Sequence, residues 1–378
     1  MKTEIKEELD TSGLEKEIVT IPSANGDATT NYNSLNTLLS TLQNTITLSS
    51  SKVQLPFGYY ANVLDLGNDL GLAISTDGVG TKIIIAQMMN KYDTIGIDCI
   101  AMNVNDILCV GAKPISMVDY IAVQKQDKKL LNDIGKGLLK GAEISKISIP
   151  AGEIAQVEEL IKSEKNGYGF DLVGTAVGTL NTKKIIDGRR IEKGDILLGL
   201  RSSGIHSNGY TLAREVLFKR YEIHAYLDEL GQTLGEELIT PTHIYVPEIM
   251  EILESGIDVK ALAHITSDGF LNLTRSQAEC GYEIENLPEP LPIFNLIQET
   301  GGILDERMFK IYNMGIGFCL VVPKSDVESV LDIYEKSEID CYVLGHTTKD
   351  EMKTVRIKDK KLEGCKKLNG IPHVFKTY

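Results

Sequence analysis

The amino-acid sequence predicts an α+β (mixed α/β) protein of two lobes. Its 378 residues exceed what one average hydrophobic core organises, so two domains are the natural expectation. Strand-like and helix-like runs are mixed in two successive blocks, and the turn-forming segment 185–190 separates them. We therefore expect an N-terminal domain over residues 52–182, a C-terminal domain over 183–378, and a cleft between them.

The expected elements follow in order along the chain. Residues 1–51 are rich in Ser, Thr and Asn from Ser23 onward, which predicts a partly flexible tail with a short helix near 35–42. In the first block the patterns predict strand 72–74, helix 94–110, strand 115–123, helix 130–145 and strand 170–180. In the second block they predict strand 196–200, helices 210–220 and 247–255, and strand 316–322.

Composition and charge exclude several classes of protein. The net charge of −14 argues against bulk binding of nucleic acid or anionic membrane, because both need a basic surface. A small anionic ligand stays compatible with local dipoles or a bound metal. Apolar runs such as 319–322 are far too short to span a bilayer, and the acidic N-terminal segment lacks a signal core, so we expect a cytoplasmic protein. The six cysteines include no Cys-x-x-Cys pair, which makes disulfides and zinc unexpected.

The most informative string is Ser-Thr-Asp-Gly-Val-Gly-Thr-Lys at residues 75–82, directly after an apolar, strand-like run. Gly78 and Gly80 allow positive φ and close approach of a ligand to the backbone in a turn. Asp77 is suited to hold a divalent cation, and Lys82, after Thr81, to meet a phosphate as a point charge. The string is neither a Walker A loop nor a Rossmann fingerprint. A nucleotide-phosphate site and a polar turn without a ligand both remain open on this string alone.

Polar residues also interrupt the apolar helix expected at 94–110. Asp98 and Asn105 are seven residues apart and share one face, while Asn103 precedes Asp106 by three. A buried carboxylate needs a cation or firm hydrogen bonds, so this helix fits either a metal site or a buried polar network. Glu153 is a further acid among small residues, which alone is most often the acid of a helix N-terminus.

Two loops of the second block carry hydroxyls, glycines and histidines. Residues 202–210 read Ser-Ser-Gly-Ile-His-Ser-Asn-Gly-Tyr, just before an expected helix, and this arrangement is typical of an anion cradle. Alternatively, Ser207 or Asn208 simply caps that helix. The loop 264–269, His-Ile-Thr-Ser-Asp-Gly, includes His264, and a single histidine of this kind is more often structural than catalytic.

Taken in order, these strings resemble the phosphoribosylformylglycinamidine cyclo-ligase family, also called aminoimidazole ribonucleotide synthetases. The matching segments run from about residue 57 to about residue 318, which is most of the chain. They are 75–82, 96–98, 101–106, 111–114, 119–120, 194–195, 202–210, 242–246, 263–266 and 313–317. One such string is weak, but the ordered set is highly specific.

The resemblance implies ATP-dependent closure of formylglycinamidine ribonucleotide to aminoimidazole ribonucleotide, with ADP and phosphate released and with ATP and Mg²⁺ bound. It implies that the carboxylates of Asp77, Asp106 and Glu153 bind the metal and set the geometry of the phosphates. The implied ATP site comprises Asp77, Gly78, Gly80, Thr81, Lys82, Asn105 and Glu153. The implied substrate side comprises Ser202, Ser203, Gly204, His206, Ser207, Asn208, His264 and Thr266, with Asp106, Lys82 and His206 as catalytic residues. The family fold also implies a homodimer in which the N-terminal lobes pair their sheets.

The sequence departs from the family pattern in three places. The family's N-terminal Tyr-x-x-Ala-Gly-Val-Asp element is only faintly echoed at residues 12–15. Gln156 stands where the family has a second acid, and Asp268 stands within what is a Gly run in the family. These departures predict a divergent, archaeal-like branch and leave the substrate open to question.

Two alternatives remain besides the cyclo-ligase. One is another ATP-dependent enzyme of the same superfamily, of kinase or dehydratase type. Selenophosphate synthetase is disfavoured among these, because the segment 55–60 lacks the reactive Cys of that enzyme. The other alternative is a non-catalytic, ATP-binding dimeric scaffold, which the joint presence of Asp77, Lys82, Asp106 and Glu153 disfavours.

Overall fold

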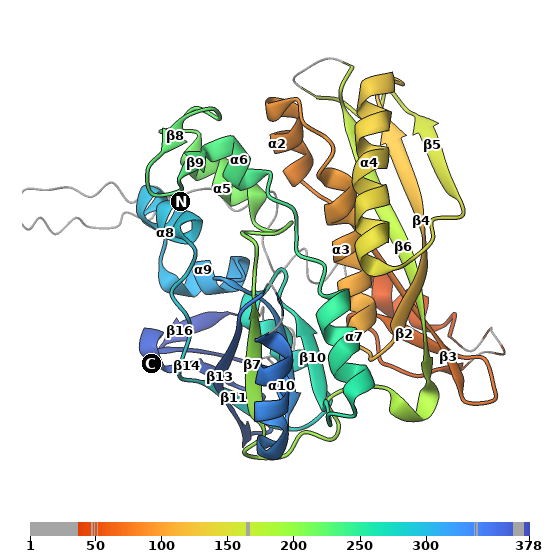
Figure 1. The fold of residues 1–378 in the computed structure, drawn as a ribbon, viewed down its shortest axis with the longest axis vertical. Coiled ribbons are helices and arrows are strands. Elements are labelled where there is room, and N and C mark those ends of the chain that lie inside the picture. Colours follow the sequence, from red (N-terminus) through yellow and green to blue (C-terminus); the bar gives the residue numbers. More distant parts are fainter. Residues whose placement is uncertain are drawn as a thin grey trace, which may run out of the picture.

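The computed structural model describes residues 37–46, 48, 50, 52–163, 167–335, 337, 339–365 and 374–378. Two large β-sheets, one in each half of the sequence, organise these residues into two lobes that lie side by side (Figure 1). The predicted class, mixed helices and strands in two lobes, is confirmed. Residues 37–43 are helical, close to the short helix expected at 35–42, and the tail up to residue 36 lies outside the described residues.

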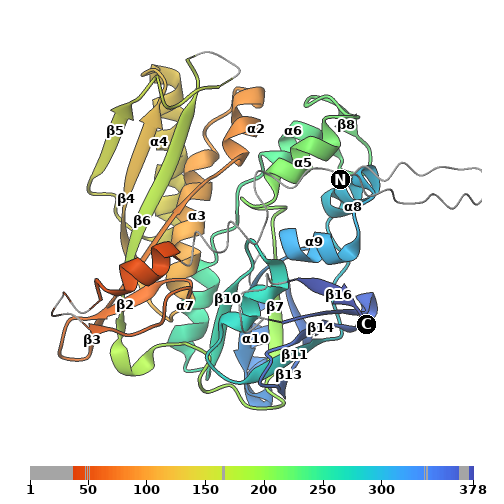
Figure 2. The same cartoon turned by 180° about the vertical axis from the view of Figure 1, so that it is seen from behind.

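The N-terminal lobe is built on a six-stranded sheet in the order β1-β2-β3-β6-β4-β5. Helix α3 packs against β3, β4 and β6, and α4 packs on α3 (Figure 2). Where these helices meet, a Cβ on Gly96 would come within 2.2 Å of the backbone nitrogen of Leu138, so this approach requires glycine. The strands are β1 (Lys52–Val53), β2 (Asn62–Asp65), β3 (Leu70–Gly78), β4 (Lys113–Val123), β5 (Gly152–Gln156) and β6 (Phe170–Asn181). The helices are α2 (Lys82–Met89), α3 (Ile95–Leu108) and α4 (Lys128–Ser145).

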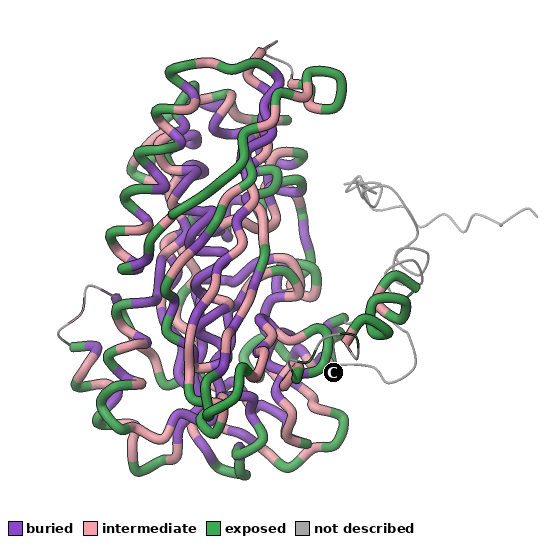
Figure 3. Tube along the Cα trace, turned by 90° about the vertical axis from the view of Figure 1, so that its right-hand side faces the viewer, coloured by how far each residue is buried: buried purple, intermediate pink, exposed green. Residues whose placement is uncertain are grey.

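The other face of this sheet carries no helix in the described part of the chain (Figures 1 and 2). Side chains alternate between the two faces of a strand. Gly174 marks the covered face, because a Cβ there would lie 2.7 Å from Asn103 Nδ2 of α3. Its neighbour Val173, paired with Tyr120, therefore faces away from α3. Val118 and Tyr120 are 42% and 44% exposed on this uncovered face, and Figure 3 shows the strands on this side alternating between buried and less buried residues.

The C-terminal lobe is built on an eight-stranded sheet in the order β10-β12-β7-β13-β11-β14-β15-β16. Strand β12 (Ile316–Val322) is buried along its whole length, which accounts for its unbroken apolar sequence. The other strands are β7 (Ile196–Arg201), β10 (Ala261–His264), β11 (Cys280–Ile284), β13 (Cys341–Lys349), β14 (Val355–Ile357), β15 (Leu362–Gly364) and β16 (Phe375–Thr377), with a separate ribbon of β8 (Tyr226–Leu227) and β9 (Gln232–Thr233). The helices are α5 (Tyr210–Leu217), α6 (Leu234–Leu238), α7 (Val246–Ser255), α8 (Pro292–Gly301), α9 (Asp305–Ile311) and α10 (Val327–Tyr334).

The two lobes share one continuous hydrophobic core. Helix α3 contacts α7 and β10 of the other lobe, and α4 also contacts α7. Val104 on α3 and Phe318 on β12, for example, belong to the same buried cluster. The polar residues of α3 therefore lie at a buried junction between lobes, where each needs a partner.

Most predicted elements are present, with ends displaced by a few residues; helix 210–220, for instance, ends at Leu217. One local prediction is wrong. The string at 75–82 is not a turn throughout, because Ser75 to Gly78 continue strand β3 and pair with β6. Only residues 79–81 turn before α2 begins at Lys82. Among the residues that the structure describes, no helix has the length and apolar character needed to cross a membrane.

Candidate active site

An acid–histidine pair joins the two lobes at the centre of the candidate site. Asp106 comes from α3 and His264 from the end of β10, and Asp106 Oδ1 lies 2.9 Å from His264 Nδ1. The His264 side chain is fully buried, while that of Asp106 is 17% exposed. Asn105 Nδ2 lies 3.5 Å from His264 Nε2. With a proton on Nδ1, the ring donates to Asp106 and accepts from Asn105, so one tautomer satisfies both contacts.

Asn105 also fixes α3 to the C-terminal lobe. Its Oδ1 accepts from the backbone nitrogen of Tyr245 (3.0 Å), and its Nδ2 donates to the carbonyl of His243 (2.9 Å). Asn105 therefore has a structural task at the junction, besides its contact with His264. The predicted sharing of one helix face by Asp98 and Asn105 is confirmed, because both bond the segment 240–245.

Asp77 stands at the end of β3, close to this pair. Asn103 Oδ1 accepts from the Asp77 backbone nitrogen (2.9 Å), and Asn103 Nδ2 donates to the Asp77 carbonyl (3.1 Å). Burial raises the pKa of the Asp77 carboxyl, and the charge of Asp106 raises it further, while the hydrogen bond that Asp77 Oδ1 accepts from the Gly78 backbone nitrogen opposes this. Two carboxylates that disfavour each other's charge make a place where a cation is stabilised.

The residues present suit a magnesium ion only in part. Within the described ranges, no three Asp, Glu, His or Cys side chains stand close enough together to hold a metal by themselves. Mg²⁺ typically takes one or two protein carboxylates and completes its shell with water and substrate phosphates. Asp77 and Asp106 fit that mode, since the two lie near enough for the charge of one to shift the pKa of the other.

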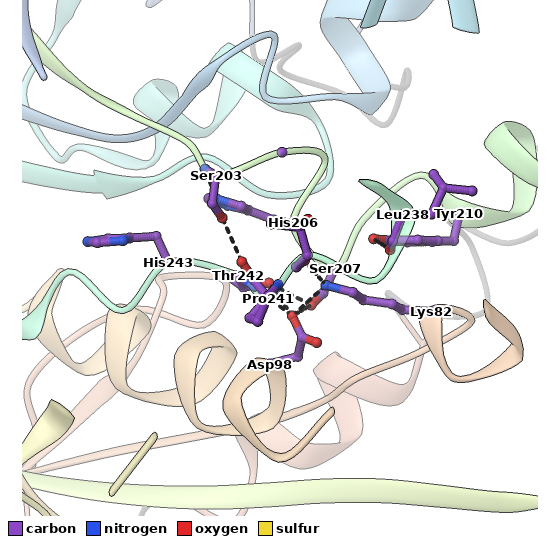
Figure 4. Close-up of polar contacts among 12 residues, drawn as sticks. Lys82, Asp98, Ser203, His206, Ser207, Tyr210, Leu238, Pro241, Thr242 and His243 are labelled. Atoms are coloured by element: carbon purple, nitrogen blue, oxygen red, sulfur yellow. Dashed lines mark hydrogen bonds and ion pairs between the residues drawn. The ribbon is translucent and has the colours of Figure 1, made fainter. Parts of the chain in front are cut away.

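Lys82 lies buried at the junction between the two lobes. Its ammonium group and the Asp98 carboxylate are both fully buried, and Lys82 Nζ donates to Asp98 Oδ1 at 2.8 Å (Figure 4). Lys82 Nζ also donates to the carbonyl of Thr240. Burial lowers the pKa of Lys82, and the charge of Asp98 opposes that shift. Asp98 Oδ1 also accepts from the backbone nitrogen and hydroxyl of Thr242, at 2.7 and 2.8 Å, and from Ser207 Oγ at 3.3 Å. Lys82 and Asp98 thus form a buried ion pair that links the two lobes, which we call the latch.

The loop at 202–209 is held by its own polar groups. Ser202 Oγ donates to Asn313 Oδ1 (3.0 Å), and Asn313 Nδ2 donates to the Gly204 carbonyl (3.0 Å). Ser203 Oγ donates to the carbonyl of Pro241 (2.6 Å). These contacts use the hydroxyls that the sequence predicts for substrate binding, so Ser202 and Ser203 shape the loop in this structure.

The rest of the loop meets neighbouring segments. Ser207 Oγ lies 2.8 Å from Thr242 Oγ1, and Asn208 Oδ1 accepts from Ser267 Oγ at 2.8 Å. Thr266, just before Ser267, is half-buried. The structure thus brings the loops at 202–209 and 264–269 together, although they are far apart in sequence.

His206 is buried and holds the loop to which it belongs. It adopts a positive φ of 61°, is 2% exposed, and its Nε2 accepts from the backbone nitrogen of Ser203 (3.1 Å). Burial holds the pKa of His206 well below its usual value, so the ring stays neutral. A neutral, buried ring that closes its own loop is poorly placed to move protons.

Glu153 is not brought to Asp77 and Asp106 within the chain. It lies exposed on the edge strand β5, not at a helix N-terminus, and pairs with Tyr120 of β4. Strand β3, which carries Asp77, and strand β5 are three strand spacings apart in the sheet, at about 4.8 Å each. Because Glu153 shares the row of Tyr120, it points to the uncovered face of the sheet.

Two of the three departures from the family pattern lie among the described residues, and the third, at residues 12–15, lies outside them. Gln156 is exposed at the end of β5. Asp268 adopts a positive φ of 73°, a conformation that glycine prefers but that Asp tolerates better than most residues. The acid in place of glycine therefore keeps the backbone path of this loop.

A cleft of about 650 Å³ opens beside the turn at Gly80 and Thr81. One face of α2 forms its apolar wall with Phe170, and polar groups form the rest. Its lining is Gly80, Thr81, Ile83, Ile84, Gln87, Met88, Lys162, Ser163, Phe170, Asp171 and Arg214. Of these lining residues, the sequence motifs include only Gly80 and Thr81, although Gly80, Ile84, Gln87 and Met88 recur at helical spacing.

Comparison with known proteins agrees with this architecture. Residues 58–180 match the family model of the AIR synthase related protein N-terminal domain, and residues 192–358 match that of its C-terminal domain. Among solved structures, the chain resembles a thiamine-monophosphate kinase from Stenotrophomonas maltophilia (TM-score 0.58, 15% identity, 85% of this chain and 95% of that one). It also resembles a hydrogenase maturation protein from E. coli (TM-score 0.55, 20% identity, 81% and 84% of the two chains). At such identities these likenesses establish the fold alone.

Sequence relatives are much nearer. A phosphoribosylformylglycinamidine cyclo-ligase from Methanobrevibacter smithii is 48% identical over 301 residues, which cover 79% of this chain and 86% of that protein. The cyclo-ligase of the same name from Methanocaldococcus jannaschii is 47% identical over 290 residues, 76% and 81% of the two chains. With both domain models matched and identity of this extent, the chain belongs to the phosphoribosylformylglycinamidine cyclo-ligase family.

Proposed function

We propose that this protein closes the imidazole ring of aminoimidazole ribonucleotide from formylglycinamidine ribonucleotide, with ATP converted to ADP and phosphate. The observation that carries the proposal is the contact of Asp106 with His264 at the lobe junction of a family member, with Asp77 near enough for the charge of Asp106 to raise the pKa of its carboxyl. ATP would phosphorylate the formyl amide oxygen, because that oxygen is a poor leaving group. The amidine nitrogen then attacks the formyl carbon that bears this phosphorylated oxygen. A C–N bond forms, the C–O bond breaks, and phosphate departs.

The residues of the site divide this work between charge and position. Asp77 and Asp106 would hold Mg²⁺, which when bound supplies charge neutralisation to the phosphoryl group in transfer. Asp106 and Asn105 orient the buried His264 ring. Gly78, Gly80 and Thr81 lie where β3 gives way to α2, and the last two line the cleft in which we place ATP.

The ribonucleotide would then lie on the C-terminal side, against the joined loops at 202–209 and 264–269. Asn208 and Thr266 are the half-buried polar side chains of these loops that we assign to its recognition. Ser202, Ser203, Gly204, His206 and Ser207 support the site as the framework of the loop. From its membership of a family of biosynthetic enzymes, we also propose that the protein is cytoplasmic.

The test of this function is product formation. Purified protein with ATP and Mg²⁺ will release ADP only when formylglycinamidine ribonucleotide is added, and aminoimidazole ribonucleotide, followed by its diazo-coupled colour, will appear in equal amount. Binding of ATP without substrate-dependent ADP would refute the reaction. It would point instead to another substrate within the superfamily or to a scaffold.

We further propose that two copies pair through the uncovered face of the six-stranded sheet. When an apolar sheet face is exposed in a single chain, it commonly becomes buried in an interface with a second chain. Besides Val118 and Tyr120, the strand rows place Ile74, Val173 and Val177 on this face. Glu153 lies on the same face, so pairing would bring it close to the partner chain. We propose that Glu153 there contributes to an active site that needs residues of both chains.

Charge at this face will break the pairing. In light scattering coupled to gel filtration, Val118→Asp will lower the mass from that of two chains to the 41.6 kDa of one, because burial of an unpaired carboxylate is strongly unfavourable. Leu139→Asp on α4, at a site already 62% exposed, is the matched control and will keep the mass of two. A wild type that elutes with the mass of one chain would contradict the dimer.

A further inference from the structure

One cation reaches the 650 Å³ cleft from the opposite lobe. Among the described lining residues, Arg214 alone belongs to the C-terminal lobe, on α5, and it is partly buried. Its guanidinium group has no hydrogen-bond or ion-pair partner among the residues that the structure describes. The backbone carbonyl of Arg214 accepts a hydrogen bond from the backbone nitrogen of Phe218. A partly buried guanidinium at the wall of a cleft suits an anion, since the group presents five donors and no acceptor.

The other charged residues near the cleft neither pair with Arg214 nor replace it as a cation for an anionic ligand. Lys82, which the sequence predicts as the phosphate-binding cation, is fully buried and committed to Asp98 and Thr240. Lys162 is exposed at the edge of the cleft. Asp171 has an internal partner, because its Oδ1 accepts from the backbone nitrogen of Leu172 (2.9 Å).

The position of Arg214 along α5 places it at the polar end of the cleft. Thr211 Oγ1 lies 3.4 Å from Thr81 Oγ1, so α5 meets the chain just before the first residue of α2. Arg214 follows Thr211 by three residues, and residues so spaced are neighbours on one helix face. Arg214 therefore lies beside Gly80 and Thr81, while Ile84, Met88 and Phe170 form the apolar wall.

We infer that Arg214 binds the triphosphate of the nucleotide in this cleft. The inference rests on the proposed function and adds to it a specificity residue from the second lobe. The apolar wall suits a base, and a guanidinium suits phosphate oxygens because it donates two parallel hydrogen bonds in a fixed plane. Since Arg214 and Thr81 belong to different lobes, the bound nucleotide bridges them.

The test is calorimetric titration with a non-hydrolysable ATP analogue, AMPPNP, in the presence of Mg²⁺, with adenosine as the phosphate-free probe. Arg214→Ala will weaken AMPPNP binding about tenfold or more and change adenosine binding less than about twofold. Arg214→Lys keeps the charge but loses the planar pair of donors, so its affinity for AMPPNP will fall between those of the wild type and Arg214→Ala. Arg220→Ala is the matched control: this exposed arginine stacks on Tyr221 outside the cleft, and its loss will leave both affinities unchanged.

Other outcomes would overturn the inference in distinguishable ways. Unchanged AMPPNP affinity in Arg214→Ala removes the residue from the site, and equal loss of AMPPNP and adenosine makes its role structural. If AMPPNP binding is normal while the KM for formylglycinamidine ribonucleotide rises tenfold, the phosphate that Arg214 meets is that of the ribonucleotide. If the wild type binds no AMPPNP, the proposed ATP-dependent function fails together with the inference.

Discussion

The Asp106→Asn variant will turn over substrate about tenfold more slowly than the wild type, or slower still, while remaining folded. Asparagine has the shape of aspartate, and its Oδ1 still accepts from His264 Nδ1, so the contact of 2.9 Å between the lobes persists. The negative charge beside Asp77 is lost, and with it part of the attraction for a cation at the transferring phosphate. Steady-state formation of aminoimidazole ribonucleotide, measured over a Mg²⁺ titration, is the measurement.

Two further measurements give this result its meaning. The melting temperature of Asp106→Asn should stay close to that of the wild type, which separates lost charge from lost structure. Asp228→Asn, an exposed acid of the C-terminal lobe, is the matched control and should leave turnover and Mg²⁺ dependence unchanged. Unchanged turnover in Asp106→Asn would remove Asp106 from the mechanism.

The Lys82→Met variant will lose about 3–5 kcal/mol of stability, a large fraction of what a typical domain possesses. Methionine keeps most of the buried stem of Lys82 but removes the charge that faces Asp98 at 2.8 Å. The Asp98 carboxylate would then remain fully buried without its cation, although Thr242 and Ser207 still donate to it. Urea unfolding followed by circular dichroism will report the loss as a lower midpoint.

A surface pair supplies the comparison for this latch. Lys183→Met removes the partner of Asp69, but that lysine is 74% exposed, so the change should cost less than about 1 kcal/mol. Adding Asp98→Asn to Lys82→Met should recover part of the stability, because it removes the uncompensated charge and keeps an acceptor for Thr242. A Lys82→Met protein of normal stability but weakened ATP binding would contradict the latch and restore the phosphate role that the sequence predicts for Lys82.

The sequence by itself determined the family, the fold class and the face of α3 that carries polar side chains. These are one-dimensional properties: motifs occur in an order, and residues seven apart such as Asp98 and Asn105 share a helix face wherever the helix packs. The sequence also identified Asp106 as a carboxylate in need of a partner, because it interrupts an apolar helix, and Asp77 as a candidate cation ligand in a glycine-containing string.

Only the tertiary structure decided which groups those residues meet. Asp106 lies 158 residues from His264, and Lys82 lies 158 residues from Thr240, so no local pattern encodes either contact. Lys82 reads as a phosphate ligand in its motif, yet the packing of α2 and α3 against the segment 240–242 buries it beside Asp98. Arg214 reads as an ordinary helix residue, and it faces the cleft because α5 of one lobe meets α2 of the other. The reason is physical: a side chain's chemistry is local, but its burial and its partners depend on surfaces that the folded chain brings together from distant segments.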